Sequence, residues 1–192
     1  MRKILVFNNL SLNGMFSDAQ GGLGWAKRDG DELTEYVKQS RGDVATYLFG
    51  KTTYQMFASF WPTPAGKAAN PYFAKILGEG RKIVFSKTLT KADWENTVIE
   101  PTADAKTIAR LKAAKGGDCL IFGSGRLVRD LVRQGLIDEY QLVLNPVILG
   151  NGHPMFGPLP DHIELHLLEA KPFKNGTVLL RYQPLPRRRL QG

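Results

Sequence analysis

Three short stretches of the sequence place a cation and hydroxyl groups directly after an apolar run that looks like a strand. They read FGKTTY at 49–54, FSKT at 85–88 and FGSGR at 122–126. In a parallel sheet, ligands bind beyond the carboxyl ends of the strands, where helix N-termini supply free N–H groups and a partial positive charge. Together, the three strand ends suit a ligand with several phosphates.

Each stretch also has a plainer interpretation. Thr52 or Thr53 could cap a helix, Ser86 could belong to an ordinary turn, and the glycines of GSG could simply let the chain turn tightly. The repetition at three strand ends favours the phosphate ligand. The pattern is not a P-loop, because no Gly-Lys-Ser/Thr closes a four-residue spacer, and it is not a Rossmann fingerprint, because NNLS follows the first strand.

The elements that must position these stretches alternate between strand-like and helix-like segments. Strands are predicted at 3–10, 44–49, 82–86, 97–100, 118–122, 138–145, 163–170 and 178–182. Helices are predicted at 29–40, 52–60 and 105–115, and after Gly125. This order predicts an α/β protein whose first two-thirds form parallel βαβ units. The turn residues KNG at 174–176 predict a hairpin, so the last third should add antiparallel strands to the same sheet.

The length and composition of the chain limit the class of protein it can be. With 192 residues, 43% of them hydrophobic, the chain can form one domain with a sizeable core. We expect a single domain at 1–186 and a basic tail at 187–192. The apolar runs are far shorter than the roughly 20 residues that span a bilayer, and NN ends the first run too early for a signal peptide. A lone cysteine, Cys119, excludes an internal disulfide and favours a reducing compartment, so we expect a cytoplasmic protein without a membrane partner.

The charge narrows the class of partner. The formal net charge is +8, which attracts polyanions, and the basic residues are spread along the chain apart from the run 187–189. No zinc-finger spacing or RNA-recognition signature occurs, so a phosphorylated small molecule is favoured and nucleic acid is not the expected partner. No metal site is expected either, because His153, His162 and His166 lack metal-ligand spacing with other His, Cys or carboxylate residues.

Six short segments carry a family resemblance. They are SLNG at 11–14, GKTTY at 50–54, Ser86 after its strand, GSGRL at 123–127, GLIDE at 135–139 and PVILGNG at 146–152. The glycine-centred segments resemble the dihydrofolate-reductase fold family. The others are similar to its single-domain relatives of the riboflavin-biosynthesis (RibD) C-terminal reductase domain. The resemblance covers nearly the whole chain and implies a three-layer α/β fold, in which helices flank a mixed, mostly parallel sheet of about eight strands.

The resemblance implies NADPH as the cofactor and hydride transfer to a small heterocyclic or conjugated substrate, such as a pterin or a pyrimidine. The residues that would hold the cofactor are Gly50, Lys51, Thr52, Thr53, Ser86, Lys87, Gly123, Ser124, Gly125, Arg126 and Leu127. The first four would lie beside the adenosine and the pyrophosphate. Ser86 and Lys87 would face the 2′-phosphate through charge-assisted hydrogen bonds. The last five would hold the pyrophosphate and ribose near the nicotinamide, where a side chain on either glycine would block close approach.

Four positions depart from the family's pattern. Lys51 stands where arginine is usual, so a point charge replaces a planar bidentate contact. Asn13 stands where aspartate is common. Ser124 stands where dihydrofolate reductases have the second glycine of a cis Gly-Gly pair, which leaves open whether the bond before Ser124 is cis. The glycine-rich turn also lacks the glutamate of the riboflavin-pathway domain, which argues against a ribosylaminopyrimidine phosphate as substrate.

The resemblance also points to a proton source. In dihydrofolate reductase, a carboxylate on the first helix, a few residues past a tryptophan, holds the substrate. Here Trp25 is followed by Asp29 and Asp31, and we expect Asp31 first and Asp29 second to be the catalytic acid. Asp29 and Glu32 also fit a capping box at the start of that helix.

Aromatic residues and a glycine-rich loop complete the expected site. Trp25, Tyr54, Phe57 and Trp61 are expected to contact the substrate, although each also suits the core or its rim. The loop at 11–25 is a candidate lid over the nicotinamide, because glycines let it change its backbone angles at low cost. The resemblance further implies a homodimer, with the late apolar strands as the contact surface.

Two other functions remain open on the sequence. A non-enzymatic nucleotide-binding or regulatory module on the same fold would bind NADPH or another nucleotide without turnover. A basic nucleic-acid-binding protein would instead bind polyanions with an affinity that falls steeply with salt.

Overall fold

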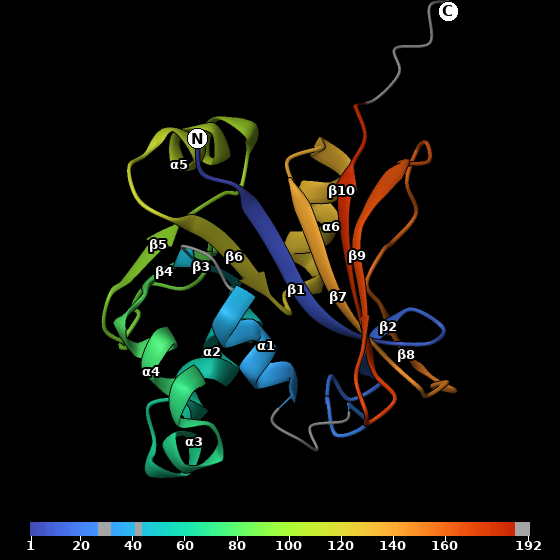
Figure 1. The fold of residues 1–192 in the computed structure, drawn as a ribbon. Coiled ribbons are helices and arrows are strands. Elements are labelled where there is room, and N and C mark those ends of the chain that lie inside the picture. The colour runs from blue at the N-terminus through green and yellow to red at the C-terminus, as the bar shows by residue number, and fades with distance from the viewer. Residues whose placement is uncertain (27–31, 41–43, 187–192) are drawn as a thin grey trace, which may run out of the picture. The chain divides into compact units, whose positions relative to one another are not determined.

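A mixed α/β fold is built around one eight-stranded sheet. The computed structural model describes residues 1–26, 32–40 and 44–186. The strand order is β5-β4-β3-β6-β1-β7-β10-β9, and β2 and β8 form a separate two-stranded sheet (Figure 1). The strands are Ile4–Ser11 (β1), Met15–Asp18 (β2), Val44–Gly50 (β3), Arg81–Phe85 (β4), Thr97–Glu100 (β5), Asp118–Phe122 (β6), Glu139–Asn145 (β7), Gly152–Pro154 (β8), Leu165–Pro172 (β9) and Val178–Pro184 (β10). The helices are Glu32–Ser40 (α1), Lys51–Phe60 (α2), Pro64–Ala69 (α3), Pro71–Glu79 (α4), Ala105–Ala113 (α5) and Gly125–Gln134 (α6). The predicted fold class and the predicted eight strands are confirmed.

The chain divides into two compact units. The first comprises residues 1–4 and 42–136, and the second comprises residues 5–41 and 137–192. The first unit holds the parallel strands β5, β4, β3 and β6. Their central residues, such as Leu48, Ile83 and Ile121, are fully buried, as expected for parallel strands covered on both faces.

Helices α3 and α4 were not predicted from the sequence. Each begins with a proline in its first turn, preceded by a capping side chain: the hydroxyl of Thr63 accepts the N–H of Gly66 at 3.1 Å, and Asn70 Oδ1 accepts the N–H of Phe73 at 2.9 Å. The prolines after Trp61 also mark the end of the helix predicted at 52–60, since proline cannot continue a helix. Proline just after Thr or Asn is also a start signal, because proline lacks the N–H that the first turn leaves unpaired.

A buried lysine closes the end of α4. Lys82 of β4 is fully buried, and its Nζ donates to the carbonyl oxygens of Leu77 at 2.6 Å, Gly78 at 3.2 Å and Gly80 at 2.8 Å. The same ammonium lies 4.6 Å from the ring centroid of Trp94. The carbonyls at the end of a helix lack intrahelical donors and carry partial negative charge, so they accept a cation there. Burial nevertheless lowers the pKa of Lys82 to about 8.

Replacing Lys82 with methionine should change how stability depends on pH. The pKa of this lysine is about 8 in the folded protein and 10.5 in an ordinary setting, so between these values the unfolded chain binds the extra proton. The unfolding free energy of the wild type therefore rises with pH in that window, whereas that of Lys82→Met has no such rise from residue 82. The difference in unfolding free energy should grow by about 2 kcal/mol from pH 7 to pH 10. Urea unfolding followed by tryptophan fluorescence measures it, with the exposed Lys75→Met as control. A difference that stays constant with pH would contradict the assignment.

The second unit holds β1, β7, β10 and β9 under helix α1. Strand β1 pairs in parallel with β7, whereas β10 is antiparallel to both β7 and β9. The predicted antiparallel addition to the sheet is therefore confirmed. Leu33 and Tyr36 of α1 pack against the cluster of Val143, Phe173 and Leu179. This apolar contact fixes α1 on one face of these strands.

The glycine-rich loop after β1 is more ordered than the sequence suggested. It contains β2, which pairs with β8 to form the small sheet. Asn13 ties the loop to the chain after β7, since its Nδ2 donates to Leu149 O at 2.8 Å and its Oδ1 accepts Leu149 N–H at 3.1 Å. Ser11 Oγ donates to the same Oδ1 at 2.8 Å. An aspartate could not donate in this way, so asparagine has a structural role at this position.

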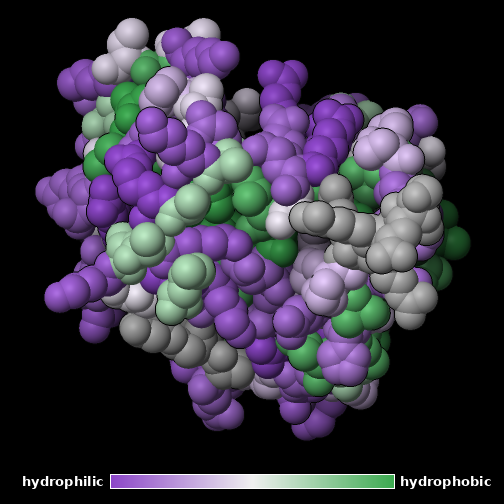
Figure 2. Space-filling view, turned by 90° about the horizontal axis from the view of Figure 1, so that it is seen from above, coloured by the Kyte–Doolittle hydropathy of each residue, from purple (hydrophilic) through white to green (hydrophobic). Residues whose placement is uncertain are grey.

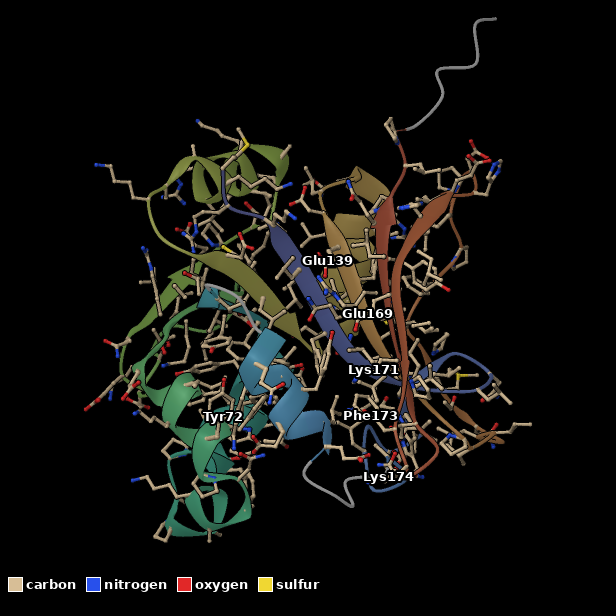
Figure 3. All side chains as sticks on the ribbon, viewed as in Figure 1. Tyr72, Glu139, Glu169, Lys171, Phe173 and Lys174 are labelled. Atoms are coloured by element: carbon tan, nitrogen blue, oxygen red, sulfur yellow. The ribbon has the colours of Figure 1, made fainter. Side chains whose placement is uncertain are left out.

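A charged network lies on the α1 side of the second unit. Arg181 of β10 donates from Nε and Nη2 to Oε1 of Glu139, both at 2.8 Å, and from Nη1 to Oε2 of Glu169 at 3.2 Å (Figure 3). The hydroxyl of Tyr36 also donates to Glu169. This hydroxyl, and then the guanidinium, hold the pKa of Glu169 below its ordinary value. The Glu139 side chain is only 6% exposed, so its charge depends on Arg181.

Candidate functional site

The three predicted strand ends meet at one edge of the first unit. Gly50 at the end of β3 pairs with Phe85 at the end of β4, and β3 also pairs in parallel with β6. Side chains and amides then link the ends: Lys51 Nζ donates to Thr88 Oγ1 at 2.9 Å, and the N–H of Gly50 donates to Ser124 Oγ at 3.0 Å. The stretches that suggested phosphate chemistry thus form one contiguous site.

Two helices begin at this site with their N-termini unblocked by acids. Helix α2 starts after Gly50 and α6 starts after Ser124, and neither cap residue makes a side-chain bond to its own helix. The first turn of each contains no Asp or Glu. The first N–H groups of an α-helix have no intrahelical acceptor, and an anion is the partner that the helix dipole favours.

The turn between β6 and α6 has an uncommon backbone. Gly123 and Ser124 both have left-handed angles, with φ of 55° and 54°. For serine this conformation costs on the order of 1 kcal/mol, so the surroundings must hold it. Thr53 Oγ1 accepts the N–H of Ser124 at 3.0 Å, and a Cβ on Gly123 would lie 3.2 Å from the Thr53 methyl carbon. The bond between residues 123 and 124 is trans, as are all peptide bonds of the described residues, which answers the question left open by the sequence.

The end of β4 carries two cations. Ser86 Oγ accepts the N–H groups of Thr88 at 3.2 Å and Leu89 at 2.9 Å, which folds the chain into a tight turn and leaves the hydroxyl proton to donate. Lys87 on this turn is exposed. The ammonium of Lys51 reaches the same turn through Thr88, so it lies by the predicted 2′-phosphate residues. Thr88 belonged to the FSKT stretch but had no predicted role, because only the fold brings Lys51 to it.

The remaining predicted cofactor residues differ in how far they are exposed to solvent. Thr52 and Arg126 are exposed at the two helix starts, whereas Leu127 is buried on the inner face of α6. Gly125 is buried in the first turn of α6. Among these residues, the side chains of Thr52 and Arg126 are therefore the ones that solvent reaches.

Three predicted substrate residues lie in the aromatic core of the first unit. Tyr54 is buried, and its hydroxyl accepts the N–H of Trp94 at 3.1 Å, so it packs as a core residue. Phe57 and Trp61 are half-buried. The Phe57 ring stacks on Phe122 with centroids 6.0 Å apart. These two half-buried rings, unlike Tyr54, keep a surface that a substrate can reach.

The residues expected to supply the proton belong to the second unit. Asp29 and Asp31 lie outside the described residues. Trp25 is half-buried, and its Nε1 donates to Gly22 O at 3.2 Å. The carboxylate of Glu32 accepts the N–H of Lys174 at 2.9 Å, which ties the start of α1 to the turn between β9 and β10. This N–H holds the pKa of Glu32 below its ordinary value. Glu32 therefore stabilises the hairpin turn, whereas the predicted capping box depends on Asp29, which lies outside the described residues.

Other kinds of site find no support in the part of the chain that the structure describes. No three His, Cys, Asp or Glu side chains of residues 1–26, 32–40 and 44–186 gather as a metal ion would require. No helix among them has the length and apolarity to cross a membrane. On the face shown in Figure 2, hydrophilic side chains are spread widely, with smaller apolar areas between them.

Comparison with known proteins agrees with this architecture. The family model of the RibD C-terminal domain matches residues 2–179. The uncharacterized protein YwjB of Bacillus subtilis is 30% identical over 179 residues, which are 93% of this chain and 96% of that protein. The crystal structure of a riboflavin biosynthesis protein, described as putative, from Shewanella sp. PV-4 superposes with a TM-score of 0.74 at 21% identity, covering 96% of this chain and 99% of that one. Dihydrofolate reductase from Enterococcus faecalis, complexed with NADP(H), superposes with a TM-score of 0.65 at 12% identity over 96% and 97% of the two chains.

Proposed function

Because the chain belongs to the RibD C-terminal domain family, we propose that it is an NADPH-dependent reductase that transfers a hydride to a small heterocyclic or conjugated substrate, pterin-like or pyrimidine-like. One observation carries the proposal: three strand ends of the first unit meet at an edge with two acid-free helix N-termini and two lysines. A similar fold holds NADP(H) in the reductase from Enterococcus faecalis.

In this proposal, different residues of the first unit bind different parts of the cofactor. Lys51, Ser86 and Lys87 hold the 2′-phosphate, because the Lys51 ammonium reaches the turn after β4 that carries the Ser86 hydroxyl and the exposed Lys87. The first turns of α2 and α6 hold the pyrophosphate through their amides, helped by the side chains of Thr52 and Arg126. Glycine at 123 and 125 lets the dinucleotide approach the backbone closely.

The cofactor, when bound, supplies the hydride, and the chain supplies binding, orientation and a proton. Phe57 and Trp61 give the substrate an apolar surface. Asp31, Asp29 or a water molecule delivers the proton, with Asp31 the first choice among them. Because both aspartates lie outside the described residues, this assignment stays a prediction from the sequence.

Titration of the purified protein with NADPH and NADH, followed by nicotinamide fluorescence, tests the proposal. Saturable binding of NADPH that is tighter than that of NADH is the expected result, followed by oxidation of NADPH in a screen of dihydropterins, pyrimidines and quinones. Binding without oxidation across the screen would favour the non-enzymatic nucleotide-binding module. Failure to bind either nucleotide would remove the cofactor assignment from all three strand ends.

A chain truncated after residue 186 separates the nucleic-acid alternative from the cofactor. If the basic tail drives binding to nucleic acid, truncation abolishes that binding and leaves the NADPH titration unchanged. Binding that survives truncation and physiological salt would favour the alternative.

The homodimer and the cytoplasmic location stay predictions. For the homodimer, β9 at the edge of the sheet is the proposed surface, since Leu165, Leu167 and Leu168 on it are exposed. Light scattering after gel filtration measures the mass directly.

A further inference from the structure

The hydroxyl groups of Thr53 and Ser124 join the start of α2 to the start of α6. The N–H of Gly50 donates to Ser124 Oγ at 3.0 Å, and the N–H of Ser124 donates to Thr53 Oγ1 at 3.0 Å. Each turn thus gives an amide to the other and accepts one in return. We infer that Thr53 and Ser124 are a positioning pair, which sets the two helix N-termini at the spacing that one dinucleotide needs; this inference rests on the proposed NADPH function.

Serine at position 124 is the first indication. Its backbone is left-handed, with φ of 54° and ψ of 47°, where glycine would fit without strain. The strained residue keeps a hydroxyl that glycine lacks, and that hydroxyl accepts the N–H of Gly50, the residue that caps α2. A side chain kept at a conformational cost, with a partner across two turns, indicates that the link itself matters.

Burial is the second indication, and it separates positioning from direct contact. Thr53 is 9% exposed and Ser124 is 7% exposed. Both hydroxyl oxygens and the amide of Ser124 are already engaged within the protein. The sequence predicted that both residues contact the cofactor. We now expect them to act by holding the backbone of the two first turns, where Thr52 and Arg126 are exposed.

The geometry distinguishes two classes of nucleotide. A dinucleotide with a pyrophosphate must contact both helix starts at once, so its affinity depends on their relative position. A mononucleotide such as adenosine 2′,5′-bisphosphate can be held by the end of β4 and the start of α2 alone. Removing either hydroxyl of the pair should therefore weaken the binding of dinucleotides selectively. A small displacement within a pre-organised site lowers the affinity of a ligand that spans it.

The experiment compares NADPH with adenosine 2′,5′-bisphosphate in four variants. Thr53→Val and Ser124→Ala each remove one hydroxyl, Ser124→Gly removes the hydroxyl and the backbone strain together, and Thr53→Ser keeps the hydroxyl. We expect the first three variants to bind NADPH about tenfold more weakly than the wild type, while their affinity for the bisphosphate stays within twofold of the wild-type value. Thr53→Ser should bind both ligands as the wild type does. Dissociation constants come from calorimetric titration, with urea unfolding as a check that each variant is folded.

The outcomes separate this inference from the proposed function. Wild-type protein that binds no NADPH would overturn both. Wild-type binding with Thr53→Val and Ser124→Ala unchanged would overturn only the positioning pair. Equal weakening of both ligands would also overturn it, since that result shows a general loss of the site. Ser124→Gly is decisive if an alanine variant fails to fold, because glycine tolerates the left-handed backbone.

Discussion

The double variant Lys51→Met/Lys87→Met should bind NADPH about 100-fold more weakly than the wild type, with NADH affinity within twofold. Two lysines lie at the turn at the end of β4, where the Lys51 ammonium donates to Thr88 at 2.9 Å and Lys87 is exposed on the same turn. A charge-assisted hydrogen bond to a phosphate contributes about 1.5 kcal/mol even near water, which is roughly tenfold for each lysine. NADH lacks the 2′-phosphate, so it loses neither contact.

A matched control variant removes two positive charges at other positions of the first unit. Lys67→Met/Lys75→Met deletes two exposed lysines from α3 and α4, which also belong to the first unit. This control should bind NADPH as the wild type does at 0.15 M salt, where charges beyond roughly 8 Å are screened. An equal loss in the control would mean that the overall positive charge attracts the cofactor. An equal loss for NADH would place the lysines at the pyrophosphate and not at the 2′-phosphate.

The sequence predicted the central part of this site because parallel strands obey simple rules. Buried parallel strands appear in the sequence as apolar runs, and their carboxyl ends must share one edge of the sheet. The stretches that begin at 49, 85 and 122 could therefore be placed together from the sequence alone. The six segments of family resemblance supplied the number of strands, which the fold confirms, and the proposed cofactor. Both inferences use local pattern and chain order, which the amino-acid sequence contains directly.

Features that depend on contacts distant in sequence could not be predicted. The left-handed backbone of Ser124 and its link to Thr53 join residues 71 apart. Lys82 is a different case, since its carbonyl partners lie only two to five residues away; its role was not predicted because helix α4, whose end it meets, was not predicted. The small sheet of β2 and β8 was missed for a related reason, since strands of four and three residues give too little alternation to recognise.

The largest loss of stability is expected from Arg181→Met. Glu139 is 6% exposed, and its Oε1 accepts two hydrogen bonds from the guanidinium at 2.8 Å and one from Gln141 Nε2 at 2.9 Å. Without Arg181 the carboxylate remains buried with a single neutral donor. Breaking one side of a buried ion pair costs about 3 kcal/mol or more, because the remaining charge has lost its partner but not its desolvation cost. The variant should therefore unfold at a clearly lower urea concentration at pH 7.

Two further variants show whether this loss comes from the unpaired charge. Lys171→Met removes a cation that lies 5.2 Å from the Tyr36 ring centroid and should cost only about 0.5 kcal/mol. The double variant Glu139→Leu/Arg181→Met removes both charges, and it should recover most of the stability lost in Arg181→Met, since replacing a whole buried pair by apolar groups is often neutral. If the double variant is instead less stable than Arg181→Met, the pair stabilises the sheet by its attraction and not merely by neutralising a buried carboxylate. With the single variant Glu139→Leu added, urea unfolding completes a double-mutant cycle and gives the coupling free energy between Glu139 and Arg181.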